Sequence, residues 1–396
     1  MKITGLKVFL INPGNRVSYG AGWGKNTILV KVYTDSGIAG LGEAFGTGKA
    51  KTTEAAIYEF ERWLIGRDPT EIVRHWMAYY RGSRYPLGTA TMAALSAVEI
   101  ALWDIAGKAC GLPIYKMLGG PFRDKVRVYA SGYLAQPRHF DLEGPPLVEA
   151  AKDVVSRGFT ALKITPQPDN YKTLSPAEVL RESVERVRQV REAVGDGVDI
   201  CLDFHGRSLS PVDAIWLARE IEKYRPLFLE EPALTEYPES LKEVKSETII
   251  PIAGGERCIS RDRLREILET RCLHILQPEP TANGGILETV KWAAMAEMHH
   301  VLLAPHQACG PVSLLACAHI DACIPNFLVQ ECNVDLASPL VNELYSNLPV
   351  IEGGYLRLPV TPGIGLEFNE AAAEKYPWKP FDRPVVIQQD GGIGME

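Results

Sequence analysis

The sequence predicts a (β/α) barrel preceded by an α+β module, and three observations support this prediction. Short apolar segments recur about every 25 residues between positions 199 and 331, the length of a strand, a turn, a helix and a return loop. Most of them are continuously apolar, as expected for parallel strands buried on both faces. Each also ends in a polar residue: DICLD at Asp203, PLFLEE at Glu230 and Glu231, PIAGGE at Glu256, HILQPE at Glu279, VLLAPH at His306 and FLVQE at Glu331. In such barrels the active site lies at the C-terminal ends of the strands.

Length and composition limit the class of protein. The chain has 396 residues, whereas a barrel takes roughly 200 to 250, so a second module is expected. The net charge of −7 argues against a nucleic-acid partner and gives no reason to expect a membrane partner. No uncharged apolar segment reaches the ~18 residues of a membrane span, and MKITGLKVFLI lacks the long apolar region and the cleavage site of a signal peptide. Together with eight cysteines that form no CxxC pair, these features predict a cytoplasmic protein with reduced thiols.

Residues 1–125 form the predicted α+β module. KITGLKVFLI and NTILVKVYTDSGIAGLGEA have the composition of strands, the second with a turn over residues 35–37. Helices are predicted over residues 49–65, 69–81 and 89–110. The last of these has apolar residues at helical spacing and ends at Gly111, a typical helix C-terminus.

The barrel is predicted over residues 126–355, with VRVYAS and ALKIT as the two strands that precede the six segments above. Ser175 and Ser210 are each followed by Pro and, three positions on, by an acidic residue, which predicts the N-terminus of a helix. The remaining segment, residues 356–396, has strand-like runs interrupted by Pro and Gly. We expect it to return to the first module and to complete it.

Three acids, Asp203, Glu230 and Glu256, end consecutive predicted strands and should project into one barrel mouth. Converging carboxylates repel one another unless a cation neutralises them. Oxygen ligands with open positions suit Mg²⁺. The alternative is that each acid is solvated or paired with a lysine. This alternative explains one such acid more easily than three acids at matched positions. We expect the adjacent Glu231 to brace the site rather than to bind metal.

Other residues at strand ends complete a candidate catalytic set. His306 lies one strand–helix unit beyond Glu279, whose carboxylate could orient the imidazole as a general base. His205 follows the strand that ends at Asp203 and should face the same pocket. Lys163, in ALKIT, could bind a substrate carboxylate or pair with a rim acid. Glu331 could donate to a developing oxyanion if protonated, or could be inert.

This set of residue types suits proton abstraction next to a carboxylate. Mg²⁺ that chelates a carboxylate stabilises the enediolate formed when a base removes the adjacent proton, which is otherwise too weakly acidic for histidine. A second histidine that protonates a departing hydroxyl turns proton abstraction into dehydration.

The chain resembles the enolase superfamily, in particular its mandelate racemase subgroup, and is most like the galactonate dehydratase branch. The resemblance covers nearly the whole chain. It rests on TDSGIAGLGEA, VEIALWDIAGKACGLPIYKMLGG, YASGY, VDICLDFHGR, YRPLFLEEP, PIAGGERCISR, ILQPEPTANGGI, LLAPHQACGP, LVQEC and LPVTPGIGLEF.

The resemblance implies a (β/α)7β barrel with an N-terminal α+β capping domain. It implies metal ligands at Asp203, Glu230 and Glu256, a base at His306 and, at His205, the acid for the leaving hydroxyl. Loops of the cap at residues 19–25 and 45–49 would close over the substrate. From these loops and from the barrel we expect substrate contacts by Trp23, Lys25 and Lys163.

The implied activity is Mg²⁺-dependent dehydration of a small sugar acid, an aldonate similar to galactonate, to a 2-keto-3-deoxy acid. One alternative is an epimerase that uses His306 and His205 as two bases. Another is a non-catalytic homologue that binds acid sugars. We also expect a homo-oligomer.

Two positions depart from the family pattern. Glu279 replaces the aspartate of the family's His–Asp dyad and is one methylene longer. Thr165 stands at the second lysine of the family's Lys-x-Lys motif. Without a base at that position, a two-base racemase that uses this motif is disfavoured and a one-base elimination is favoured.

Overall fold

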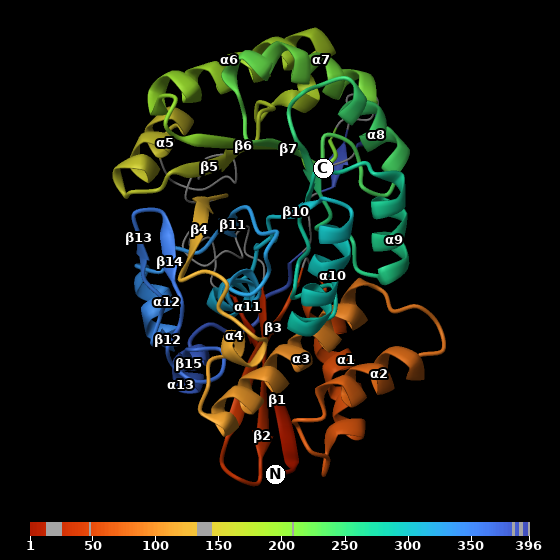
Figure 1. Cartoon of the computed structure of the whole chain (residues 1–396), viewed down its shortest axis with the longest axis vertical. Coiled ribbons are helices and arrows are strands. Elements are labelled where there is room, and N and C mark those ends of the chain that lie inside the picture. The colour runs from red at the N-terminus through yellow and green to blue at the C-terminus, as the bar shows by residue number, and fades with distance from the viewer. Residues whose placement is uncertain are drawn as a thin grey trace.

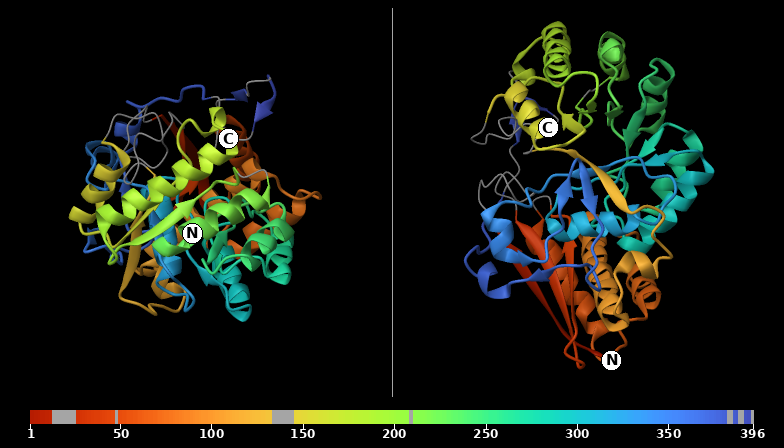
Figure 2. Two further views of the ribbon diagram at one scale, coloured as in Figure 1. Left: turned by 90° about the horizontal axis from the view of Figure 1, so that it is seen from above. Right: turned by 60° about the vertical axis from the view of Figure 1, so that its left-hand side comes forward.

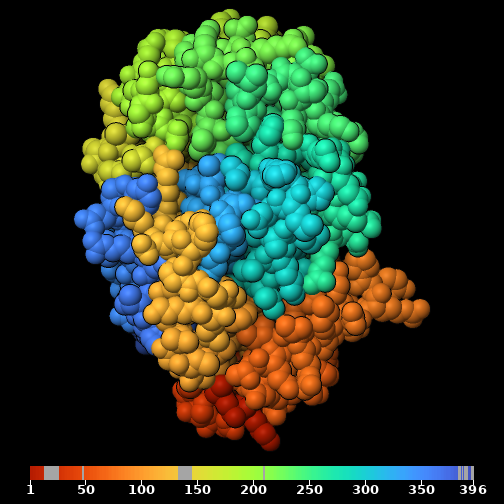
Figure 3. All heavy atoms as spheres, in the orientation of Figure 1, coloured from red at the N-terminus to blue at the C-terminus, as the bar shows by residue number. Residues whose placement is uncertain are grey.

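The computed structural model describes residues 1–12, 26–46, 49–132, 145–207, 210–381, 385–387 and 391–394. The chain forms a barrel and a smaller N-terminal unit at one end of it (Figure 1). The two units meet along a broad face, where the orange helices contact the cyan part of the barrel (Figure 3).

The barrel alternates strands and helices. Its strands are β4 (Lys125–Ala130), β5 (Ala161–Ile164), β6 (Asp199–Asp203), β7 (Phe228–Glu230), β8 (Ile252–Gly254), β9 (Ile275–Leu276), β10 (Leu302–Leu303) and β11 (Gln330–Cys332). Its helices are α5 (Leu147–Ser156), α6 (Pro176–Val194), α7 (Pro211–Ile221), α8 (Pro238–Ser246), α9 (Arg261–Thr270), α10 (Ile286–Met298) and α11 (Pro311–Asp321). Neighbouring strands from β4 to β10 are parallel, and β11 pairs in parallel with β4. The predicted (β/α)7β barrel is confirmed.

One residue in or directly beside each strand fills the barrel interior. This buried layer consists of Tyr129, Ala161, Cys201, Phe228, Ala253, Ile275, Ala304 and Val329. Side chains in a strand return to the same face every second residue. The residues two positions further on therefore also face inward, at the barrel mouth. They include Ser131, Lys163, Asp203, Glu230, His306 and Glu331.

The helix boundaries follow the predicted signals. Ser175 and Glu178 form a reciprocal capping box at the start of α6, and the Ser210 hydroxyl accepts the Val212 amide at the start of α7. In the N-terminal unit, the long helix ends at Gly111, which adopts the left-handed conformation with φ of 68°.

The N-terminal unit is a three-stranded antiparallel sheet covered by helices. Its elements are β1 (Ile3–Ile11), β2 (Thr27–Thr34), β3 (Ala39–Ala44), α1 (Ala50–Leu64), α2 (Ile72–Gly82), α3 (Thr89–Cys110) and α4 (Ile114–Met117). Glycines in β3 allow α3 to lie against the strand, because a Cβ at Gly40 or Gly42 would come within 2.0 Å of a carbonyl oxygen of α3. Among the described helices α3 alone is apolar and long enough to cross a membrane, but it is mostly buried in this core.

The C-terminal part of the chain contacts both units. It contains α12 (Pro339–Leu344), β12 (Tyr345–Ser346), β13 (Ile351–Glu352), β14 (Tyr355–Arg357), β15 (Glu367–Phe368), α13 (Glu370–Ala373), β16 (Val386–Ile387) and β17 (Ile393–Gly394). Strand β14 pairs with barrel strand β4. Further on, Phe368 packs edge-on against Phe9, and Glu370 accepts hydrogen bonds from Lys31 and Tyr33. Figure 2 shows part of the blue C-terminal region beside the red sheet. We propose that the capping domain, residues 1–125, is completed by the segment that follows β14.

Candidate active site

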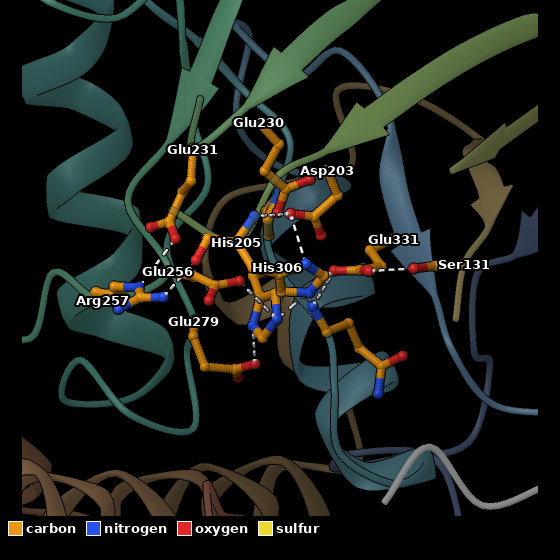
Figure 4. A network of polar contacts seen from close by, with 12 residues as sticks. Ser131, Asp203, His205, Glu230, Glu231, Glu256, Arg257, Glu279, His306 and Glu331 are labelled. Carbon is orange, nitrogen blue, oxygen red and sulfur yellow. Dashed lines mark hydrogen bonds and ion pairs between the residues drawn. The ribbon is translucent and has the colours of Figure 1, made fainter. Parts of the chain in front are cut away.

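Three carboxylates lie at the ends of adjacent strands in the barrel mouth (Figure 4). Asp203 and Glu230 are direct register partners on β6 and β7, and both are buried. Glu256 follows β8 after Gly255, whose φ of 121° suits glycine. Burial and the neighbouring Asp203 raise the pKa of Glu230 well above its usual value. One Glu230 oxygen, Oε1, has no hydrogen-bond partner among the described residues.

Lys163 on β5 joins carboxylates from three other strands. Its Nζ lies 3.0 Å from Asp203 Oδ2, 2.8 Å from Glu230 Oε2 and 2.9 Å from Glu331 Oε1. Burial alone would lower the pKa of this lysine, but the three carboxylates raise it well above its usual value. Lys163 is therefore a fixed cation at the floor of the mouth.

His306 contacts two carboxylates, one at each ring nitrogen. Nδ1 lies 2.9 Å from Glu279 Oε2, and Nε2 lies 3.0 Å from Glu256 Oε2. Glu279 is itself held by Thr281, whose amide and hydroxyl donate to Oε1 at 2.9 and 2.6 Å. The additional methylene of Glu279 therefore does not prevent contact with the imidazole.

The surroundings of His306 also determine its charge. Burial opposes protonation, but Glu256, Glu331 and Glu279 together raise the pKa of His306 to about 10. Because Glu256 is the largest of these raising influences, a cation that engages Glu256 would lower the pKa of His306 toward the range of a general base.

His205 lies just beyond β6 in a left-handed backbone conformation, with φ of 52°. Its amide donates to Asp203 Oδ1 at 3.0 Å, and its carbonyl accepts from Arg257 Nη2 at 2.9 Å. Its side chain is about one-third exposed, at 31%. The imidazole is thus accessible while its backbone is held from both sides.

Glu331 on β11 accepts hydrogen bonds from three directions. Ser131 Oγ donates at 2.5 Å, the Gln307 amide at 2.9 Å, and Lys163 Nζ lies 2.9 Å away. Burial opposes ionisation, but Lys163 and His306 outweigh it and lower the pKa of Glu331. Glu331 is therefore a partner of Lys163, and its role as a protonated donor to an oxyanion stays a prediction.

Two family models match large parts of the chain. Residues 8–119 match the mandelate racemase / muconate lactonizing enzyme N-terminal domain, and residues 146–372 match the enolase C-terminal domain-like family. The chain belongs to the enolase superfamily.

Relatives of this superfamily member extend over its full length. It is 38% identical to a D-galactonate dehydratase of Ralstonia nicotianae and 36% identical to one of Cronobacter sakazakii, with 99% of each chain covered in both cases. Its fold matches a putative galactarate dehydratase of Agrobacterium radiobacter, bound to Na and L-malate, with a TM-score of 0.88, 29% identity and full coverage of both chains. A putative mandelate racemase/muconate lactonizing enzyme of Labrenzia alexandrii matches with a TM-score of 0.87 and 33% identity, over 98% of this chain and 100% of the other.

The strand-end acids of this enolase-superfamily site fit a divalent cation by their chemistry. All are oxygen donors on adjacent strands, and the unpaired Oε1 of Glu230 is an available ligand atom. No group of three His, Cys, Asp or Glu side chains within the described ranges is arranged to hold a metal as it stands. The reason is visible in the contacts: Lys163 Nζ lies within 3.0 Å of both Asp203 and Glu230, and Glu256 is turned to His306. Metal binding would require Lys163 to move away from Asp203 and Glu230, and Glu256 to turn away from His306.

Two expected substrate contacts from the cap, Trp23 and Lys25, lie outside the described residues. The other cap loop does reach the mouth at Phe45. The Phe45 amide donates to the Thr281 carbonyl at 3.0 Å, and its ring lies edge-on to His306 with centroids 5.9 Å apart.

Sequence reasoning did not single out several residues that support this site. They are Ser131, Arg257, Thr281 and Gln307, each of which bonds to a predicted site residue. Ser131 could have been predicted from the two-residue periodicity of β4. For Arg257 and Thr281, the only signal in the sequence was that they lie close along the chain to Glu256 and Glu279.

Proposed function

We propose that this protein, an acid-sugar dehydratase of the carbon–oxygen lyase class, is Mg²⁺-dependent and acts on an aldonate similar to galactonate. The observation that carries the proposal is the contact of Glu279 with His306 on one side of a carboxylate cluster that also holds His205. The full-length relatives named D-galactonate dehydratase support the substrate class.

Asp203, Glu230 and Glu256 would hold the Mg²⁺. When bound, it would supply positive charge that stabilises the substrate carboxylate as negative charge develops on it. Lys163 provides a second cation for the same oxygens, which is consistent with its burial among acids. We propose that the substrate carboxylate binds beside Lys163.

The two histidines divide the proton transfers. His306, oriented through Nδ1 by Glu279, removes the proton from C2 with Nε2. His205 donates a proton to the hydroxyl on C3, which leaves as water when the C3–O bond breaks. The resulting enol takes up a proton at C3 and becomes the 2-keto-3-deoxy acid.

The first test is a panel of aldonates and aldarates incubated with the protein and Mg²⁺, with 2-keto acid detected by semicarbazide. Product from an aldonate is expected. Inversion at C2 without any 2-keto acid would indicate an epimerase, and binding without either reaction would indicate a non-catalytic homologue.

The second test separates the histidines in deuterated solvent. His306→Asn should abolish both dehydration and exchange of the C2 proton, because no base remains. His205→Asn should abolish dehydration and retain exchange, because the C2 proton can still be removed and returned. Retained exchange in His306→Asn together with lost exchange in His205→Asn would reverse the assigned roles.

A further inference from the structure

We infer that Arg257, anchored by Glu231, is a positioning residue for His205 and controls the loss of the hydroxyl group rather than the abstraction of the C2 proton. The inference rests on the proposed function, in which His205 is the acid. It concerns a residue that contacts His205 only through the backbone.

The guanidinium of Arg257 links the loop after β6 to the loop after β7 (Figure 4). Nε donates to Glu231 Oε2 at 2.9 Å, and Nη2 donates to the His205 carbonyl at 2.9 Å. Glu231 is fully buried, and its other oxygen accepts the Thr235 hydroxyl at 2.6 Å. Glu231 is therefore held in place, and Arg257, which is bonded to Glu231, in turn holds the carbonyl of His205.

The backbone that Arg257 holds is in an unfavourable conformation. His205 has φ of 52° and Glu231 has φ of 39°, and non-glycine residues adopt such values only when their surroundings impose them. The two loops also bond directly, from the Gly206 amide to the Glu231 carbonyl at 2.9 Å. Without the Arg257 contact, the His205 carbonyl loses one of the constraints that keep the residue in this conformation.

The base has a separate support. Among the described residues, the His306 ring forms ion pairs with Glu279, Glu256 and Glu331 and none with Arg257. Loss of the guanidinium should therefore displace the acid and spare the base. A displacement of about 1 Å of a catalytic group can cost on the order of 100-fold in rate.

The experiment compares dehydration with C2-proton exchange in deuterated solvent, with D-galactonate as the probe and Mg²⁺ present. In Arg257→Gln, the rate of 2-keto acid formation should fall at least about tenfold. The rate of exchange, measured as disappearance of the C2 proton signal, should fall less than about threefold. The ratio of exchange to dehydration thus shifts toward that of His205→Asn. If wild-type protein turns over another acid sugar and not D-galactonate, that sugar replaces the probe.

Arg261→Gln is the matched control. Arg261 lies four residues further on and pairs with the buried Glu288 through Nη2 at 2.6 Å, and it forms no hydrogen bond with His205 in the part of the chain that the structure describes. The control should leave the ratio of exchange to dehydration unchanged. Arg257 adjoins the proposed ligand Glu256, so loss of Mg²⁺ binding has to be excluded as the cause of an altered ratio. The rise in Tm on addition of Mg²⁺ must therefore persist in Arg257→Gln.

A second variant guards against simple destabilisation. In Arg257→Gln alone, Glu231 loses its charge partner, so the double variant Glu231→Gln/Arg257→Gln removes the unpaired carboxylate as well. It should recover Tm and keep the altered ratio. Equal losses of exchange and dehydration in both variants, or wild-type values of both, would overturn the inference. Absence of any 2-keto acid from wild-type protein would instead overturn the proposed function.

Discussion

Two buried histidines, His306 and His319, show how neighbouring groups determine the role of a residue. His306 is surrounded by carboxylates, which raise its pKa to about 10. On α11, both ring nitrogens of His319 bond to backbone groups: Nδ1 accepts the Tyr115 amide at 3.2 Å, and Nε2 donates to the Ile364 carbonyl at 3.1 Å. Because Nδ1 accepts a hydrogen bond, these contacts suit a neutral ring, and His319 is a structural residue.

His319 should make the stability of the protein depend on pH. Burial lowers the pKa of His319 to about 4, whereas the unfolded chain has the ordinary value near 6.5. As pH falls from about 6.5 to 4, the unfolded state takes up a proton that the folded state does not, and stability falls by about 1.4 kcal/mol per pH unit. Urea unfolding at pH 7 and pH 5 should show a smaller difference in His319→Gln, by about 2 kcal/mol. An unchanged difference would contradict the assignment.

At the level of elements, two barrel helices are capped by the N-terminal unit. The N-cap residues Gly285 of α10 and Gly310 of α11 provide no side chain for this purpose. Glu99 on α3 accepts the amides of Ile286 and Leu287 at 2.8 and 3.0 Å, and Glu43 on β3 accepts those of Gly310 and Ser313 at 2.7 and 3.0 Å. A carboxylate at a helix N-terminus satisfies free amides and opposes the helix dipole. The caps thus also fasten the two units together.

Glu99→Ala should therefore destabilise the whole protein by about 2 to 3 kcal/mol, because buried amides of α10 lose their acceptor. The measurement is urea unfolding at pH 7. Glu178→Ala is the matched control, since Glu178 belongs to an exposed capping box on α6 and should cost about 1 kcal/mol or less. Equal costs would show that the contact between the units contributes nothing beyond local capping.

Across the whole molecule, negative charge is concentrated at the barrel mouth. Asp203, Glu230, Glu256, Glu279 and Glu331 converge there from five strands or the loops that follow them. Within the described ranges, Lys163 is the one lysine that forms ion pairs with this cluster. A divalent cation that binds the folded state alone would relieve this repulsion and shift the folding equilibrium.

Mg²⁺ should consequently raise the Tm of the protein relative to a sample with chelator. At a concentration 100 times Kd the stabilisation is about 2.7 kcal/mol. Differential scanning calorimetry of Glu256→Gln should show a reduced shift, because a ligand is weakened, while Glu236→Gln, a partly exposed acid that contacts Arg257, should retain the full shift. A full shift in Glu256→Gln would place the cation elsewhere.

The barrel, and the strand ends at which the candidate site residues lie, could be predicted from the sequence. Parallel strands of similar length bring their C-terminal ends to one rim, and the two-residue period of a strand determines which side chains face inward. This is why the positions of Asp203, Glu230 and His306 could be inferred without coordinates. The predicted helices over residues 49–65, 69–81 and 89–110 correspond to α1, α2 and α3 for the same reason of local periodicity.

Tertiary structure alone decided the partners of these residues. Glu99 caps a helix that begins at Ile286, Arg257 holds the carbonyl of His205, and Lys163 occupies the space between acids of three other strands. Such contacts join segments far apart in the chain and depend on the conformations of loops and the docking of one unit on another. Local periodicity specifies which face of an element a side chain occupies, but the distance to a partner on another element is determined only when the whole chain packs.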